Sequence, residues 1–146
     1  RGLSDPSGAA TGGWPGSVAS LSEHWRKMAV LYVALGSALG GVCRFVVSRA
    51  LNGQGLFPWG TLGVNVAGSL LIGLLGGFLA KWSGSASAAV RLFAVVGFCG
   101  GFTTFSTFSN EAMTFLQRGQ FGLCCCYVGV SVLAGLLAVW VGLKLA

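Results

Sequence analysis

Residues 100–111 read Gly-Gly-Phe-Thr-Thr-Phe-Ser-Thr-Phe-Ser-Asn-Glu and stand in the middle of an otherwise apolar sequence. Hydroxyl groups are costly in hydrocarbon unless a hydrogen-bond partner satisfies them. A dense hydroxyl block at membrane depth therefore predicts a polar pathway, and we interpret this segment as the functional core. Three phenylalanines, which a simple water-filled pore rarely needs, are interleaved with the hydroxyl residues Thr103, Thr104, Ser106, Thr107 and Ser109.

The composition of the whole chain indicates a membrane protein. Of its 146 residues, 54% are hydrophobic and 8% are charged, and the mean hydropathy is +0.79. Soluble domains carry about 25% charged residues. The net charge of +6 reflects a scarcity of acids, which are Asp5, Glu23 and Glu111. No basic run carries interleaved aromatics, so the sequence argues against nucleic-acid binding.

Hydrophobic stretches predict an all-α membrane protein with four transmembrane helices. They cover about residues 28–51, 59–81, 89–116 and 121–145. Each is near or above the roughly 20 residues that an α-helix needs to cross a bilayer. The connections are short, and the four spans leave no room for a soluble catalytic domain. Such a small bundle buries little surface, so we expect the chain to form oligomers.

Residues 1–27 differ from the rest of the chain because Gly, Ser, Pro and Ala dominate them. The part from 4 to 22 is predicted to be disordered. It lacks the basic start and apolar run of a signal peptide. We expect Met28 to be the biological start and residues 1–27 to be a leader or a non-native extension, which leaves 28–146 as the transmembrane channel domain.

The basic residues predict no preferred orientation in the membrane. Counted from Met28, alternating spans place three basic residues on each side, so the positive-inside rule gives no bias. Arg26 and Lys27 would break this tie if they belong to the native chain. A balanced chain can insert both ways and form an antiparallel dimer. The two sets are Lys81, Arg91 and Lys144 on one side, and Arg44, Arg49 and Arg118 on the other.

Drawn as one continuous helix, the third span has a polar arc of roughly 160° and an aromatic arc opposite it. The Gly100-Gly101 pair can break this helix and expose carbonyls, which is tolerated at membrane depth only beside a cavity or an ion. The alternative is that Phe packs against lipid while the hydroxyls bond back to helix carbonyls. The polar arc holds Thr103, Thr104, Ser106, Thr107, Asn110, Glu111 and Thr114; the aromatic arc holds Phe105, Phe108 and Phe115.

Three further polar residues are candidates for the site. Asn65 lies in the run GTLGVNVAGS at 60–69, and its amide offers either two donors to an anion or an interhelical hydrogen bond. Arg44 lies inside the first span, where it either attracts anions into a vestibule or has a structural role. Glu111 is expected to anchor the far end of the third span, with a basic residue as its candidate partner.

Together these segments resemble the Fluc/CrcB family of fluoride channels. The matching pieces are residues 36–44, the run GTLGVNVAGS at 60–69 and the run GFCGGFTTFSTFSNE at 97–111, with a weaker match at 127–135. The third-span run is the most specific of them. The resemblance covers about residues 28–146.

Membership implies an antiparallel, dual-topology homodimer in a cell membrane, with passive export of fluoride that lowers cytoplasmic fluoride. The implied fluoride pathway has Asn65 as donor, Phe105 and Phe108 as an aromatic box, and hydroxyls at Thr104, Ser106, Thr107 and Ser131. The backbone carbonyls of Gly100 and Thr103 are implied to hold a structural sodium ion at the dimer interface. Fluoride is small and strongly hydrated, so hydroxyls, an amide and electropositive ring edges are suitable replacements for its water.

Other functional classes fit less well. A small multidrug transporter is also a four-span dual-topology dimer, but it needs a carboxylate in its first span, and residues 28–51 contain no Asp or Glu. A purely structural membrane subunit would not need the hydroxyl-phenylalanine block. An enzyme is not expected, because no span contains His and Glu111 is the only carboxylate in them. Cys124, Cys125 and Cys126 match no metal-ligand spacing and are interpreted as packing residues, with palmitoylation as the second interpretation.

Overall fold

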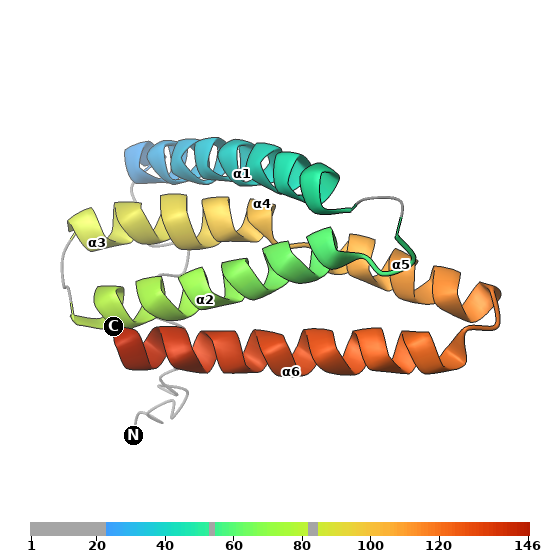
Figure 1. Ribbon diagram of the computed structural model, residues 1–146. Helices are drawn as coiled ribbons and strands as arrows, with labels where there is room; N and C mark the ends of the chain where they lie inside the picture. The colour runs from blue at the N-terminus through green and yellow to red at the C-terminus, as the bar shows by residue number, and fades with distance from the viewer. Residues whose placement is uncertain (1–22, 53–54, 82–84) are drawn as a thin grey trace, which may run out of the picture.

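The described part of the chain is helical and contains the four predicted spans. The computed structural model describes residues 23–52, 55–81 and 85–146 (Figure 1). Four helical stretches are long and apolar enough to cross a membrane, which confirms the expected number of spans. They are Trp25–Leu51, Trp59–Lys81, Ala88–Gln117 and Phe121–Leu145.

Three of the spans are single helices: α1 (Glu23–Leu51), α2 (Trp59–Lys81) and α6 (Phe121–Leu145). Helix α1 begins five residues before Met28, so residues 23–27 of the predicted leader are helical. The segment 4–22, for which we expected disorder, lies outside the described residues.

The third span is divided into four segments with a break near its middle. They are α3 (Ser85–Val90), the π-helical η2 (Arg91–Cys99), α4 (Gly100–Phe102) and α5 (Phe105–Gln117). The break lies at Thr103 and Thr104, whose backbones are extended, with φ −77° and ψ 158° at Thr103 and φ −148° and ψ 118° at Thr104. The third helix is therefore broken as expected.

The glycine pair, which can break a helix, does not itself form the break. Gly100 has helical angles of φ −63° and ψ −37°, and both glycines belong to α4. Gly101 instead lies against α1, where an added Cβ would be 2.5 Å from the carbonyl oxygen of Ser37. The missing side chain at Gly101 thus permits close packing of two helices.

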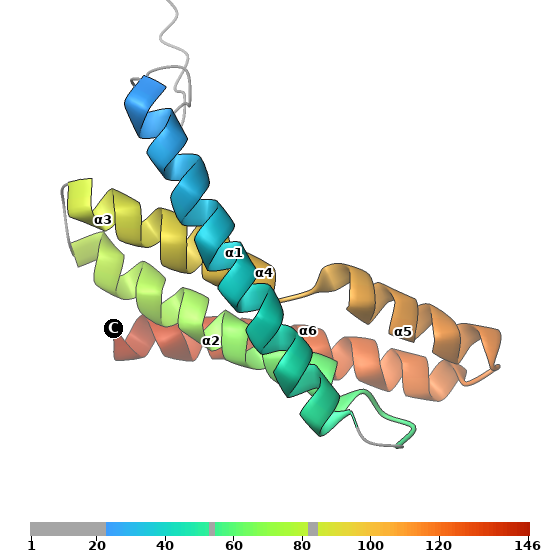
Figure 2. The ribbon, with the colours of Figure 1, turned by 90° about the horizontal axis from the view of Figure 1, so that it is seen from above.

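Glycines bring the described helices into backbone contact at several crossings. Helix α1 packs on η2 and α4, where Cα of Gly36 lies 2.9 Å from the position of a Cβ on Gly97. Helix α2 packs on α6, where a Cβ on Gly142 would be 2.5 Å from the carbonyl oxygen of Leu70. Lipid is as apolar as the helix surfaces, so such close contact replaces the hydrophobic effect as the source of association. Figure 2 shows α1 crossing over the other helices at a steep angle.

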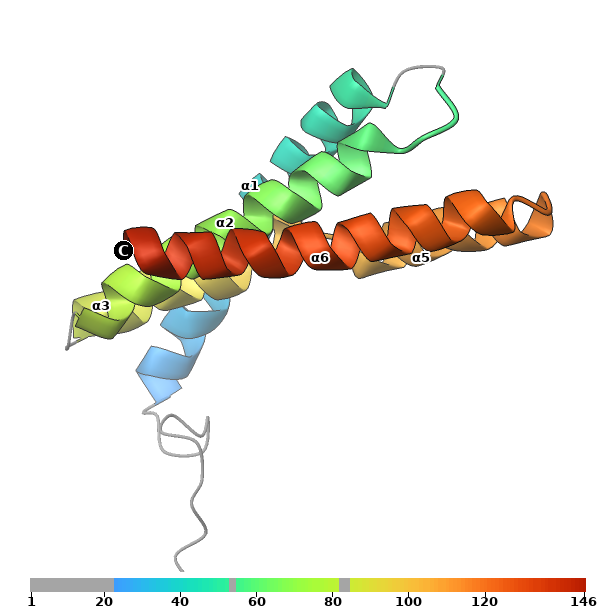
Figure 3. The same cartoon turned by 60° about the horizontal axis from the view of Figure 1, so that its bottom comes forward.

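Beyond the break, α5 leaves α1 and runs beside α6 (Figure 3). A small core forms there from Leu62, Phe115, Cys124 and Tyr127. The chain alternates between the two ends of the bundle (Figure 1), so the last-turn residues Lys81 and Lys144 share one end. Many apolar side chains on the outside of the helices are exposed, as expected for surfaces that contact lipid.

Candidate functional site

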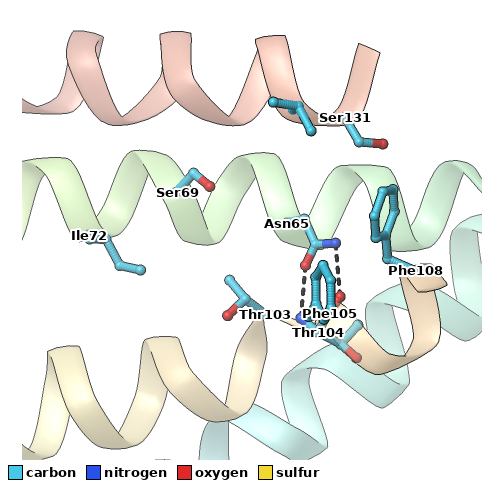
Figure 4. A pocket seen from close by; sticks show the side chains of 9 residues that line it. Asn65, Ser69, Ile72, Thr103, Thr104, Phe105, Phe108 and Ser131 are labelled. Atoms are coloured by element: carbon cyan, nitrogen blue, oxygen red, sulfur yellow. Dashed lines mark hydrogen bonds between the residues drawn. The ribbon is translucent and has the colours of Figure 1, made fainter. Parts of the chain in front are cut away.

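The side chain of Asn65 on α2 holds the break in the third span. Its Nδ2 donates to the carbonyl oxygen of Thr104 at 3.1 Å, and its Oδ1 accepts from the Thr104 N–H at 2.8 Å (Figure 4). Both ends of the amide are thus bonded to the backbone of one extended residue. Of the two functions considered for Asn65, the interhelical hydrogen bond is present. One of the two Nδ2 hydrogens remains available in addition.

The hydroxyl of Thr104 caps the N-terminus of α5. Thr104 is the N-cap residue, and its Oγ1 accepts from the Thr107 N–H at 3.2 Å. The same Oγ1 donates to Thr107 Oγ1 at 3.0 Å and lies 3.4 Å from Ser106 Oγ. Caps of this kind satisfy one of the N–H groups that a helix start leaves without partners. The predicted polar track therefore begins as a connected hydroxyl cluster at the positive end of α5.

A cavity of about 300 Å³ brings together five of the seven residues predicted for the anion pathway. Thr104 and Phe105 face it from the break, Asn65 from α2 and Ser131 from α6 (Figure 4). The Oγ of Ser131 is buried and has no hydrogen-bond partner within the described part of the chain. An unsatisfied hydroxyl in this position is available to a bound species. The complete lining is Asn65, Ser69, Ile72, Thr103, Thr104, Phe105, Phe108, Ser131 and Val132.

A second hollow, of about 380 Å³, places Arg44 together with Arg49. Thr104 lines both hollows, and Thr107, a sixth member of the predicted pathway, lines the second. Two guanidinium groups beside hydroxyls make this region attractive to anions. Sequence reasoning used Arg49 only in the charge count, because its proximity to Arg44 and the hydroxyls depends on how α1 meets the break. The complete lining is Arg44, Phe45, Ser48, Arg49, Asn52, Thr61, Thr104 and Thr107.

The three phenylalanines of the predicted aromatic arc lie on one helix, α5, but they differ in their surroundings. Phe108 and Phe115 pack on Tyr127, with ring centroids 5.1 and 5.8 Å away. Phe105 is 80% exposed, although its ring centroid lies only 5.9 Å from that of Phe108. The residues of the aromatic arc thus differ in burial. Phe108 belongs partly to the core, and Phe105 projects from the surface of the chain.

Glu111 is bonded to hydroxyl groups and not to the basic partner that we considered for it. Its Oε1 accepts from Thr61 Oγ1 and its Oε2 accepts from the Tyr127 hydroxyl, both at 2.7 Å. Tyr127 has no exposed surface. Sequence reasoning missed Thr61 and missed Tyr127 as a partner, and the only available signal was the presence of both in segments that resemble the family. The carboxylate links α5 to α2 and α6.

Other hydroxyls of the third span bond to their own helix, as the alternative interpretation proposed. Ser109 Oγ donates to the carbonyl of Phe105, and Thr114 Oγ1 donates to the carbonyl of Asn110, both at 2.9 Å. Thr103 Oγ1 donates to the carbonyl of Cys99 at 2.9 Å. Only part of the predicted polar arc is therefore available to another molecule.

The backbone at the end of α4 offers oxygen ligands. The last carbonyls of a helix have no intrahelical donor, and α4 ends at the extended Thr103. At Gly100 the helix surface is open, because nothing lies within 4 Å of where a Cβ would be. Uncharged carbonyl oxygens are suitable ligands for hard cations. Gly100 and Thr103 therefore fit the chemistry expected of a sodium site.

Comparison with known proteins identifies the family of the chain. The family model described as "CrcB-like protein, Camphor Resistance (CrcB)" matches residues 31–143. The chain belongs to the CrcB family. This match contains every candidate site residue named above, and it confirms the resemblance seen in the sequence. The four spans and the family together make the CrcB chain a multi-pass membrane protein.

Several relatives share the name "Fluoride-specific ion channel FluC". The chain is 43% identical to the one from Flavobacterium psychrophilum over 119 residues, which are 80% of this chain and 95% of the relative. It is 46% identical to the one from Novosphingobium aromaticivorans over 121 residues, covering 80% and 94% of the two chains. The CrcB chain thus spans nearly the whole length of these relatives.

Proposed function

We propose that this CrcB-family protein is a channel that conducts fluoride passively across a membrane and lowers its concentration in the cytoplasm. The names of the relatives support the choice of ion. The observation that carries the proposal is the cavity at the break, where Asn65, Ser131 and the Phe105 ring meet at membrane depth. The protein is a channel and not an enzyme.

The charges and donors of the two hollows suit a small anion. Arg44 and Arg49 concentrate anions at the second hollow, and Thr104 lines both that hollow and the cavity at the break. Inside, the unsatisfied Ser131 Oγ and the ring edges of the phenylalanines replace water around the ion. No Lys or Arg occurs in residues 97–110, which favours rapid release.

The active unit in this proposal is an antiparallel homodimer. The protomer exposes Phe105 and the open surface at Gly100, and a second chain of opposite orientation would cover both. The basic residues counted from Met28 are balanced and allow both orientations. The carbonyl oxygens of Gly100 and Thr103 from the two chains would hold a sodium ion at the interface. This ion joins the chains and is not transported.

The direct test is fluoride efflux from liposomes that contain the purified protein. Vesicles loaded with potassium fluoride should release fluoride after addition of a potassium ionophore. Fluoride that leaves alone builds up a membrane potential, and potassium that leaves through the ionophore removes it. Vesicles loaded with chloride should release little, and an imposed proton gradient should not be required. Absence of fluoride release from vesicles with correctly assembled protein would overturn the proposal.

A further inference from the structure

The break in the third span deprives two carbonyl oxygens of their helical donors. In a continuous α-helix each N–H bonds the carbonyl four residues earlier, so the N–H groups of Thr104 and Thr107 would bond Gly100 and Thr103. Here the Thr104 N–H donates to Asn65 Oδ1 at 2.8 Å. The Thr107 N–H donates to Thr104 Oγ1 at 3.2 Å. Two side chains thus take the donors that belong to the two carbonyls of the proposed sodium site.

We infer that Asn65 and Thr104 are positioning residues that create this cation site. The inference rests on the proposed sodium site. Each side chain binds one N–H group, and the carbonyl oxygens of Gly100 and Thr103 therefore stay available as ligands. Carbonyls at membrane depth require a partner, because lipid offers no hydrogen-bond donors. Replacing their N–H partners by side-chain acceptors leaves a cation to satisfy them.

The competing state is a third span that continues through the break as one helix. Both flanking segments are helical, and only Thr103 and Thr104 depart from helical angles. Asn65 opposes this state because its amide bonds both the N–H and the carbonyl of Thr104, as a neighbouring strand would. Thr104 Oγ1 also disfavours the continuous helix, because it caps the N-terminus of α5 directly after the break. In the continuous helix both carbonyls would be bonded, and the ligands would be lost.

This assignment links the cation site to the anion cavity, because Asn65 belongs to both. Asn65 lines the cavity beside Phe105 while its amide holds the backbone that carries the carbonyls. A change at Asn65 should therefore affect sodium binding even when fluoride is absent. A residue whose only function is to donate to fluoride would have no such effect.

The test measures how sodium stabilises the purified full-length protein in detergent without fluoride. Melting temperature is recorded from zero to saturating sodium chloride, with N-methylglucamine chloride keeping the ionic strength constant. The variants Asn65→Leu and Thr104→Val remove the amide and the hydroxyl but keep the branched shape and the number of side-chain heavy atoms. Controls are Ser69→Ala, which changes the same cavity but not the break, and Thr104→Ser, which retains the cap.

Asn65→Leu and Thr104→Val should each raise the half-saturating sodium concentration by about tenfold or more, because a ligand carbonyl regains its N–H donor. The two controls should stay within about twofold of the wild type, a difference of less than half a kcal/mol. General destabilisation would lower the melting temperature at every sodium concentration without moving the half-saturating value.

The possible failures are distinguishable. If the melting temperature of the wild type does not change with sodium concentration, the sodium site itself is overturned. The fluoride channel is then still tested separately by efflux from liposomes. A wild type that responds to sodium, with variants that shift no more than Ser69→Ala, would overturn the positioning roles alone. If Asn65→Leu does not assemble, the comparison of Thr104→Val with Thr104→Ser decides the question, because they differ in whether the hydroxyl is kept.

Discussion

Gly101 offers a sharp test of how the third span packs. It lies against α1, whereas the adjacent Gly100 has open space around it. A Cβ on Gly101 would lie 2.5 Å from the carbonyl oxygen of Ser37 and 2.9 Å from its Cα. Carbon and carbonyl oxygen normally approach to about 3.3 Å, so Gly101→Ala must separate α4 from α1 by roughly 0.8 Å. Both contacting atoms belong to backbone, and no side chain can rotate to make room.

Overpacking of this kind costs about 1–3 kcal/mol in a well-packed core. The loss is increased here because the interface of α1 with η2 and α4 is built on backbone contact, which even a small separation weakens. Replacement of a helical Gly by Ala contributes about 1 kcal/mol in the stabilising direction. We therefore expect Gly101→Ala to lower the stability of the purified protein by about 1–2 kcal/mol, since the clash outweighs the gain in helix propensity.

The assay is thermal unfolding in saturating sodium, with Gly41→Ala as the matched control. Gly41 lies in α1, and nothing is within 4 Å of the position of its Cβ. Gly41→Ala should therefore unfold at or slightly above the wild-type temperature. Equal melting temperatures for Gly101→Ala and the wild type would refute the reasoning, and Gly101 would then have no packing function.

Three further outcomes are expected. Phe108→Ile and Phe105→Ile remove the ring quadrupole but keep an apolar side chain, so fluoride efflux should fall sharply while gel filtration still shows a dimer. Flux near the wild-type level in both would mean that these rings only pack. Tyr127→Phe keeps the buried ring but removes the hydroxyl that donates to Glu111, which should cost about 1.5–3 kcal/mol in thermal unfolding; an unchanged melting temperature would contradict the importance of that bond. Ser85→Cys, made in a chain without its native cysteines, should react with an impermeant reagent from both sides of the membrane if the dimer is antiparallel; labelling from one side alone would exclude dual topology.

The sequence alone determined the membrane class, the four spans and the presence of a break in the third. Hydropathy predicts spans because a helix in lipid must satisfy its backbone within itself, and about 20 apolar residues suffice. The hydroxyl block also marked the correct neighbourhood, since Thr104, Phe105 and Phe108 all line the cavity at the break. These features depend on residues close together in the chain, and a linear sequence reveals them.

Only the tertiary structure decided which hydrogen-bond donor pairs with which acceptor. The break lies at Thr103 and Thr104 and not at the glycine pair, because Asn65 on another helix binds the Thr104 backbone while Gly101 is needed against α1. Glu111 is bonded to hydroxyls of α2 and α6 for a similar reason: only the packing of α5 brings them within reach. Hydropathy contains no information about such partners. In lipid an unsatisfied polar group is costly, so its partner is set by whichever helix the packing places beside it.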